Sequence, residues 1–254
     1  MSTPRVPFPR TAIRLVLAAA VVLGLACSAA ASPADGVHYY AVEINGTLCG
    51  YTKSVVDTEA IDGLDRMVID EEVFLMLTVL GSQFNTEVVS HAVVDPISGN
   101  FLEQAVSVEQ GPNTITFGAK VDGATAHVES SLLGGAREVA LPEGVVLENS
   151  QFFPHVVRDL LDAEQAEVRY QTLEVREAAV QEQVYTRVAV EPLELSTGTR
   201  EALVVDKRNT VTGLKIRMWI DADDATFLRA EIPGGRVVYR TDPSVTKKVE
   251  VANL

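Results

Sequence analysis

Turn-forming dipeptides recur from residue 37 onward and divide the chain into short runs rich in Val, Ile, Thr and Tyr. Asn45-Gly46 separates residues 38–44 from residues 47–56, and this pair suits a type I′ hairpin turn because both of its positions take positive φ. Ile61-Asp62-Gly63 and Asp122-Gly123 mark further turns. Because the apolar runs between such turns are short and rich in β-formers, the sequence predicts a mainly β fold.

Apolar and polar side chains alternate in several of these runs, which is typical of antiparallel strands with one wet face. Ile115, Phe117 and Ala119 share one face, with Thr114 and Thr116 on the other. The run 73–77 is apolar throughout and predicts a central strand, or one that contacts other parts on both faces. The predicted strands are residues 38–44, 47–56, 67–80, 84–94, 101–109, 114–121, 125–129, 168–176, 180–190, 211–220, 226–232, 236–240 and 247–251, with a short candidate at 202–205 inside the irregular segment 191–209.

One segment departs from the β pattern. Residues 154–167 lack Gly and Asn, and four Val and Leu residues between Val156 and Leu161 follow helical spacing. Ser150 would cap this helix, or Pro154 would occupy its first turn. The apolar stripe is short, so we expect a short helix that packs on a sheet.

The first 31 residues predict an export signal. Arg5, Arg10 and Arg14 form a positively charged region without an acidic residue, and an uncharged, mostly apolar run follows from Leu15 to Ala26. This run is too short to span a bilayer as a permanent helix, which needs about 20 residues. We therefore expect an exported protein.

Two cleavage sites fit this signal. Ala29-Ala30-Ala31 suits an ordinary signal peptidase, which would leave residues 32–254 as a single β-rich domain. The segment 23–27 resembles a bacterial lipobox, although Gly24 stands where Leu is usual; here the signal would be residues 1–26, and lipidated Cys27 would tether the protein to a membrane. Ser28 would then favour the outer membrane. In the first case the protein is periplasmic and Cys27 is only a small apolar residue of the signal.

Charge excludes one class of partner. The net charge is −14, and loss of the three signal arginines makes the mature part more acidic. Such a field repels phosphate backbones and anionic lipid surfaces, so nucleic acid is not an expected partner. The acidic residues are spread along the chain, and solubility is their simplest role.

The chemistry-bearing residues form no recognisable catalytic pattern. After cleavage at residue 31 only Cys49 remains, so no internal disulfide can form. His38 or His91 would have to lie across strands from Cys49 to activate it, and a structural cysteine is the favoured interpretation. The four histidines, which also include His127 and His155, do not pair at a zinc-binding spacing.

The other candidate sites fit turns and edges better than binding sites. Asp221, Asp223 and Asp224 form an acidic turn, but the Gly and distal Glu of an EF-type calcium loop are missing. Glu71-Glu72 is interpreted as a solvated edge, as is the segment 62–65. Gly134-Gly135 and Gly234-Gly235 carry no phosphate-loop pattern. We therefore predict no catalytic, cofactor-binding or metal-binding residue.

Two stretches resemble known families. Tyr40–Tyr51 is similar to the opening hairpin of the β domain that precedes the catalytic core in bacterial transglutaminase-like proteins, and to exported families of unknown function. Leu214–Arg229, with Trp219-Ile220-Asp221 and Phe227-Leu228-Arg229, resembles the late hairpin of those families, whose relatives are half-barrel carriers of the lipoprotein-localisation type. No Cys…His…Asp set of a transglutaminase core is present, so no functional residue carries over.

The resemblance implies a mainly β fold in which a single strongly curved antiparallel sheet, an open or half barrel, holds the helix on its concave face. The first functional hypothesis is a non-enzymatic envelope protein that binds or carries a lipid-like apolar ligand. The second is a structural or interaction protein with a filled core. The third is a hydrolase, which would need histidines and carboxylates converging near Cys49. The filled core would be packed by Phe74, Leu75, Phe117, Phe152 and Trp219.

Overall fold

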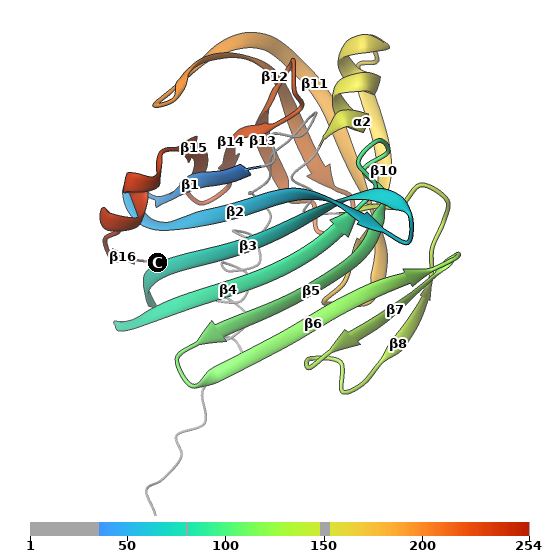
Figure 1. The fold of residues 1–254 in the computed structure, drawn as a ribbon. Helices are drawn as coiled ribbons and strands as arrows, with labels where there is room; N and C mark the ends of the chain where they lie inside the picture. Colours follow the sequence, from blue (N-terminus) through green and yellow to red (C-terminus); the bar gives the residue numbers. More distant parts are fainter. Residues whose placement is uncertain (1–35, 80, 148–152, 254) are drawn as a thin grey trace, which may run out of the picture.

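The computed structural model describes residues 36–79, 81–147 and 153–253, and most of these residues belong to one 16-stranded sheet (Figure 1). The first half of the chain supplies β1 (Gly36–Ile44), β2 (Thr47–Ile61), β3 (Leu64–Val79), β4 (Ser82–Val94), β5 (Phe101–Gln110), β6 (Asn113–Asp122), β7 (Thr125–Ser130), β8 (Arg137–Ala140) and β9 (Val146–Leu147). The second half supplies β10 (Glu167–Glu174), β11 (Ala179–Leu195), β12 (Gly198–Asn209), β13 (Lys215–Asp221), β14 (Phe227–Ile232), β15 (Arg236–Thr241) and β16 (Ala252–Asn253).

The strands are ordered β8-β7-β6-β5-β4-β3-β2-β1-β15-β14-β13-β12-β11-β10-β9, and β16 adds to β3. The pairs are antiparallel except β9 with β10 and β16 with β3. The sheet curls strongly on itself (Figure 1). Within the described part of the chain the edge strands β8 and β9 do not pair with each other, so the sheet stays open. The predicted open or half barrel is therefore confirmed.

A short backbone link joins the β9 edge of the sheet to the beginning of β5. The amide of Phe101, at the start of β5, donates to the carbonyl of Val145 at 3.1 Å, and Asn100 forms a β-bridge with Val146. The segment that contains β9 therefore contacts both β10 and the beginning of β5.

The hairpin turns follow the predicted turn chemistry. Asn45 and Gly46 have φ of 51° and 78°, and Asp62 and Gly63 have φ of 52° and 76°. Positive φ at both central positions matches the right-handed twist of the flanking strands. These turns set the register of β1 with β2 and of β2 with β3.

The helix lies where the sequence predicts it, but it is shorter and less regular. It comprises α2 (Pro154–Val157) and a π-helical turn, η1 (Arg158–Asp162), in which the Ala163 amide donates to the Arg158 carbonyl at 2.9 Å. Pro154 occupies the first turn, as one of the two alternatives predicted, whereas Ser150 lies outside the described residues. The predicted end at residue 167 is wrong because positive φ at Glu164 ends the helical path.

Buried side chains of this helix pack on the concave face of the sheet. Val156 and Leu160 join a hydrophobic cluster with Val42, Leu75 and Leu203, which come from β1, β3 and β12. The predicted docking of the helix on the concave face is therefore confirmed. Within the described part of the chain, no helix is long and apolar enough to cross a bilayer.

The long β11–β12 hairpin is the largest correction to the predicted strands. Segment 191–209 was predicted to be irregular, yet β11 continues to Leu195 and only two residues separate it from β12. Its tip bends over the sheet, where Ser196 and Thr241 bring their hydroxyl oxygens to 3.4 Å. Leu193 and Leu195 cover a small second cluster that contains Trp219. This packing overrides the turn-like composition of the segment.

Two smaller corrections concern the C-terminal segment and the edge strands of the sheet. The predicted strand 247–251 is wrong: η2 (Pro243–Lys247) is a 3₁₀ helix, and only Ala252–Asn253 forms a strand, β16. Asp242 explains the difference, because its carboxylate caps this helix by accepting the Ser244 amide at 2.8 Å. The sequence also did not predict the short edge strands β8 and β9.

Candidate functional site

A row of polar side chains crosses the concave face from β1 to β4. Cross-strand register places His38 opposite Ser54, Ser54 opposite Glu71, and Glu71 opposite Ser90. Directly opposite residues in antiparallel strands have their Cβ atoms about 5 Å apart. His38, Ser54 and Glu71 are buried and Ser90 is half-buried. We call these four residues the polar belt.

The alternation of β3 turns Glu71 inward. Ile69 and Val73, two residues away on either side, point to the same face and are buried, whereas Asp70 and Glu72 point outward and are exposed. Successive side chains of a strand point to opposite faces, so Glu71 shares the environment of the core. The prediction of a solvated edge is correct for Glu72 and wrong for Glu71.

Glu71 is the least satisfied member of the polar belt. Its side chain is 7% exposed, and Ser90 Oγ donates to Oε2 at 3.3 Å. Its Oε1 has no hydrogen-bond partner among the described residues, and no described cation forms an ion pair with it. Burial raises the pKa of Glu71 well above its ordinary value, and the Ser90 hydrogen bond opposes this effect. A neutral carboxyl group can donate as well as accept a hydrogen bond.

His38 ends the polar belt beside a cation. Arg240 Nη2, on β15, lies 3.1 Å from His38 Nδ1. Because a guanidinium can only donate, Nδ1 accepts this hydrogen bond and the proton of a neutral ring is on Nε2. Arg240 is therefore the charged group at this end of the polar belt.

Apolar clusters flank the polar belt on both sides. The next row towards the β3–β4 turn contains Tyr40, Val73 and Val88, and the next row towards the β2–β3 turn contains Ile69 and Ala92. The cluster that contains the first of these rows also contains helix residues, and we call it the helix cluster; its members include Tyr40, Val73, Leu75, Leu77, Val88, Val108, Val156 and Leu160. The cluster that contains the other row is called the meander cluster; its members include Val56, Met67, Ile69, Ala92, Val94, Phe101, Ala119 and Val128.

A second buried polar group lies on the helix. His155 is 2% exposed, and its Nδ1 has no hydrogen-bond partner among the described residues. Burial lowers the pKa of His155 to about 4, so the ring is neutral at pH 7. The edge of Tyr170 packs against this ring at 4.6 Å between centroids, and its hydroxyl donates to Asp159 at 2.7 Å. A Cβ at Gly99 would lie 2.9 Å from His155 Nδ1, so only glycine fits there.

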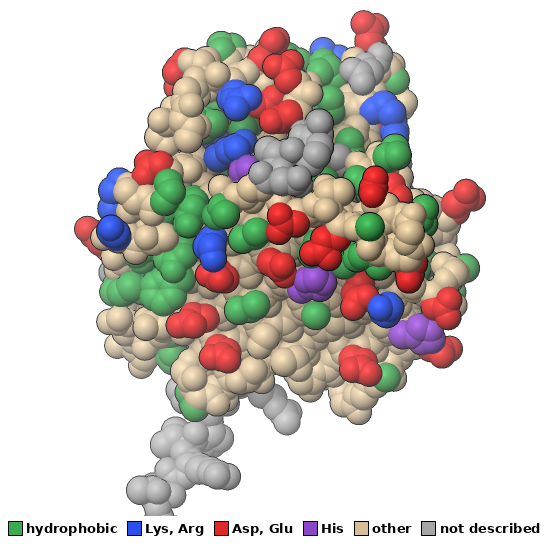
Figure 2. Space-filling view, in the orientation of Figure 1, with side chains coloured by type: hydrophobic (Ala, Val, Ile, Leu, Met, Phe, Trp, Pro, Cys, Tyr) green, Lys and Arg blue, Asp and Glu red, His purple; other side chains and the backbone are tan. Residues whose placement is uncertain are grey.

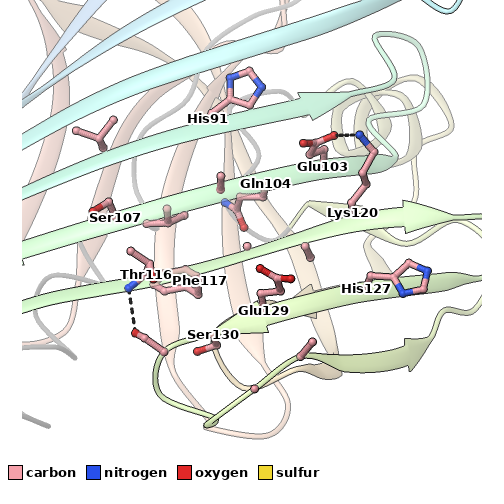
Figure 3. Close-up of a pocket in the computed structure, with 18 of the residues that line it drawn as sticks. His91, Glu103, Gln104, Ser107, Thr116, Phe117, Lys120, His127, Glu129 and Ser130 are labelled. Carbon is pink, nitrogen blue, oxygen red and sulfur yellow. Dashed lines mark hydrogen bonds and ion pairs between the residues drawn. The ribbon is translucent and has the colours of Figure 1, made fainter.

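The outward face of β4–β7 carries an open groove of about 890 Å³ (Figure 3). Ala105 and Gly118 are among its small lining residues. Two of the charged pairs at its rim are Lys120 Nζ with a Glu103 oxygen at 2.7 Å and His91 Nδ1 with an Asp70 oxygen at 2.9 Å. Acidic side chains are scattered over this side of the molecule without a single patch (Figure 2). The groove therefore presents mainly paired charges to solvent, whereas Glu71 on the concave face keeps a buried oxygen without a partner among the described residues.

The structure does not gather the residues that a hydrolase would need near Cys49. Cys49 is fully buried, its thiol lies 3.5 Å from the Val42 carbonyl, and burial raises its pKa to about 11. His38 faces inward, whereas His91 faces outward beside Asp70. The inert environment of Cys49 fits the structural role that the sequence favoured.

The acidic turn at Asp221 is a capped hairpin. Asp221 Oδ1 accepts the amides of Asp223 and Asp224 at 3.0 and 3.2 Å. Burial is the main cause of the raised pKa of Asp221, and Arg200 approaches its other oxygen at 3.4 Å. Within the described ranges, no group of three or more His, Cys, Asp or Glu residues could hold a metal ion. Cys27, the lipidation candidate, lies outside these ranges.

The large apolar residues that were expected to fill the barrel are divided between the two faces of the sheet. Leu75 and Phe117 face the concave side, but Trp219 belongs to the small separate cluster under the β11–β12 hairpin. Phe74 neighbours Leu75 on β3 and therefore faces outward, where it packs on Tyr51 at 5.8 Å. Phe152 lies outside the described residues.

Comparison with known proteins supports the fold and does not show a family. No protein-family model and no curated protein matches the chain. The crystal structure of a beta-barrel-like protein of the domain of unknown function DUF1849 from Brucella abortus is similar over 81% of this chain and 95% of its own, with a TM-score of 0.55 and 10% identity. A DUF1089 family protein from Pseudomonas aeruginosa reaches a TM-score of 0.40 over 72% of this chain and 90% of its own, with 17% identity, which is too low to support an argument. The chain is thus a β-barrel-like domain similar in fold to a protein of unknown function.

Proposed function

We propose that the protein is a non-enzymatic protein of the cell envelope that binds or carries a lipid-like ligand on the concave face of its sheet. The observation that carries this proposal is the division of that face into two apolar clusters separated by the polar belt. Sites for small apolar ligands usually combine an apolar lining with a few convergent polar groups. The export signal predicted for residues 1–31 supports the envelope location.

A structural protein with a filled core is the second candidate. Tyr40, Leu75 and Leu203, which belong to the helix cluster, are fully buried. Such burial is also what a concave face packed by its own side chains would give. The two candidates differ in whether the purified protein holds a ligand.

The test is to express the full chain with its own leader, purify it after export, and extract it with organic solvent for mass spectrometry. The proposal predicts a lipid or acyl compound in near-stoichiometric amount. It also predicts that a fluorescent fatty acid binds to the extracted protein in a saturable manner. No extracted compound together with no saturable binding would leave the filled core as the function of this face.

Two substitutions on one strand supply the matched control. Ser90→Phe places a large side chain on the concave face, whereas Val89→Phe places the same side chain on the outward face, where Val89 is 58% exposed. Fatty acid binding should fall at least tenfold in the first variant and stay unchanged in the second. Circular dichroism of both variants checks that the fold is retained. Equal binding by both variants would exclude the concave face as the site.

The predicted location has a separate test. Mass spectrometry of the N-terminus of the native protein distinguishes cleavage after Ala31 from an acylated N-terminal Cys27. The first result supports a periplasmic protein and the second an outer-membrane lipoprotein. An uncleaved N-terminus would contradict both forms of the envelope proposal.

A further inference from the structure

The buried acid of the polar belt has a hydrogen-bonding capacity that no described residue uses. Within the part of the chain that the structure describes, Glu71 Oε1 has no hydrogen-bond partner although the residue is more than nine-tenths buried. Buried polar atoms are nearly always paired, because an unpaired one forfeits its hydrogen bonds to water. An inward-facing acid with one oxygen left unpaired is therefore more readily explained by a ligand than by stability.

The surroundings of Glu71 favour an uncharged partner. The nearest belt residues across the strands, Ser54 and Ser90, carry neutral hydroxyl groups. The cation next to the polar belt, Arg240, lies beside His38 at the far end of the row. His38 is on β1, two strands from β3, and Arg240 is on β15, one strand further away. A charged group brought to Glu71 would have to lose its hydration between two apolar clusters, which costs far more than the same burial of a hydroxyl or an ester.

The position of Glu71 fixes where this polar group must stand in the ligand. Val73 and Val88, on one side of the Glu71–Ser90 pair, belong to the helix cluster, and Ile69 and Ala92, on the other side, belong to the meander cluster. A ligand that contacts both clusters and reaches Glu71 must therefore carry its polar group between two apolar stretches.

We propose that Glu71 is the polar contact for the ligand, and that the ligand is an acyl compound with an uncharged oxygen group, a hydroxyl or an ester, between two apolar stretches. This inference rests on the proposed lipid-binding function and specifies its substrate class. Ser90 is a positioning residue, since its hydroxyl group holds Oε2 and leaves Oε1 directed at the ligand.

The experiment uses two probes that differ by one mid-chain hydroxyl group: methyl 12-hydroxystearate and methyl stearate. The ester of both probes stands at the end of the chain with only a methyl group beyond it, so only the hydroxyl lies between two apolar stretches. Each displaces a fluorescent fatty acid from the exported, delipidated full-length protein. The wild-type protein should bind the hydroxylated chain about tenfold more tightly, which is the size expected of one well-made buried hydrogen bond. Glu71→Leu should bind methyl stearate as well as wild type does and lose the preference for the hydroxyl.

Glu71→Gln supplies the conservative variant, because an amide has the same shape and still forms hydrogen bonds. It should keep part of the preference, and Ser90→Ala should reduce the preference without abolishing binding. Outward-facing Glu72→Leu is the matched control and should behave as wild type. Thermal unfolding of each variant confirms that binding differences do not come from loss of the fold.

The possible failures can be told apart. If wild type binds neither probe and no fatty acid, the proposed lipid-binding function itself is wrong. If wild type binds both probes equally, or if Glu71→Leu keeps the preference, Glu71 is not the polar contact although the lipid-binding function stands. A third probe, stearylamine, tests the charge: if it binds most tightly and loses its affinity in Glu71→Gln, the partner of Glu71 is a cation and the inference is overturned.

Discussion

Glu71 and Glu72 are neighbours in β3 and lie on opposite faces of the sheet. Glu71 faces the concave side, is 7% exposed and forms no ion pair with a described cation. The Glu72 side chain is 62% exposed, and the Lys53 ammonium group lies 3.1 Å from its carboxylate. Burial therefore shifts the pKa of Glu71 upward, whereas the charge of Glu72 is stabilised by water and a partner.

The same contrast extends to the histidines and to the apolar side chains. His155 is buried on the helix, whereas His91 is partly exposed beside Asp70 on the outward face. Leu75 is fully buried, whereas Val89 is 58% exposed. The curvature of the sheet decides which face is enclosed, so identical residue types have different energies on its two sides. This difference predicts how substitutions on the two faces will behave.

The largest expected effect is on the concave face. Leu75→Ala should destabilise the protein by about 4 kcal/mol, because it removes a fully buried side chain and leaves a cavity in the helix cluster. Val89→Ala should change stability by less than about 0.5 kcal/mol. Urea unfolding followed by circular dichroism measures both values. Similar losses for the two variants would show that the outward face is packed as tightly as the concave one.

The fold is predictable to the extent that local patterns decide it. The Asn45-Gly46 and Asp62-Gly63 turns, the one-sided strands and the site of the helix all follow from local sequence. The β11–β12 hairpin does not, because Pro192 and the segment 196–199 are typical of a loop. What keeps that segment extended is its packing over Trp219, a contact that sequence alone does not reveal.

The polar belt could have been found only in part. Glu71 stands in phase with Ile69, Val73 and Leu75, so the alternation of β3 already places it on the buried face. Because Glu72 is adjacent, the sequence shows two consecutive acids, a pattern typical of a solvated edge, and this pattern wrongly predicts exposure for Glu71. The neighbours of Glu71 across the strands depend on the register of β2, β3 and β4, which no local pattern specifies.

The second largest expected effect is a loss of folding stability at acidic pH, caused by His155. Its pKa is about 4 in the folded protein against about 6.5 when unfolded, so protons bind the unfolded chain first as the pH falls. The stability that depends on neutral His155 is complete above pH 6.5 and is lost between pH 6.5 and pH 4, on the order of 3 kcal/mol. Urea unfolding at pH 7 and pH 4.5 measures it.

His155→Phe removes the titrating group while keeping an aromatic ring beside Tyr170. Its stability should therefore depend less on pH than that of wild type over this range. His91→Phe, on the outward face, should retain the full wild-type dependence. If the two variants respond to pH alike, burial of His155 is not the source of the acid sensitivity.

Glu71 predicts the opposite direction of pH dependence. Its folded pKa lies above its unfolded value, so the folded protein keeps a proton that the unfolded chain releases. Stability from this group is complete below the unfolded pKa and declines as the pH rises, by up to about 1.4 kcal/mol per pH unit until the folded pKa is reached. Glu71→Gln should remove this decline and be more stable than wild type at pH 8. Thermal melts from pH 5 to pH 8 test this, and a variant that is less stable than wild type at pH 8 would contradict it.

The smallest effect belongs to the exposed ion pair on the outward face. Lys53→Ala and Glu72→Ala should each change the free energy of unfolding by less than about 0.5 kcal/mol, because water screens the pair and both side chains lose entropy when they hold it. A double-mutant cycle in low and high salt isolates the interaction, which should shrink as salt is added. A coupling above about 1 kcal/mol that persists in high salt would mean that Glu72 is shielded from water. The contrast with Glu71 would then arise from the partner cation rather than from the enclosure of the concave face.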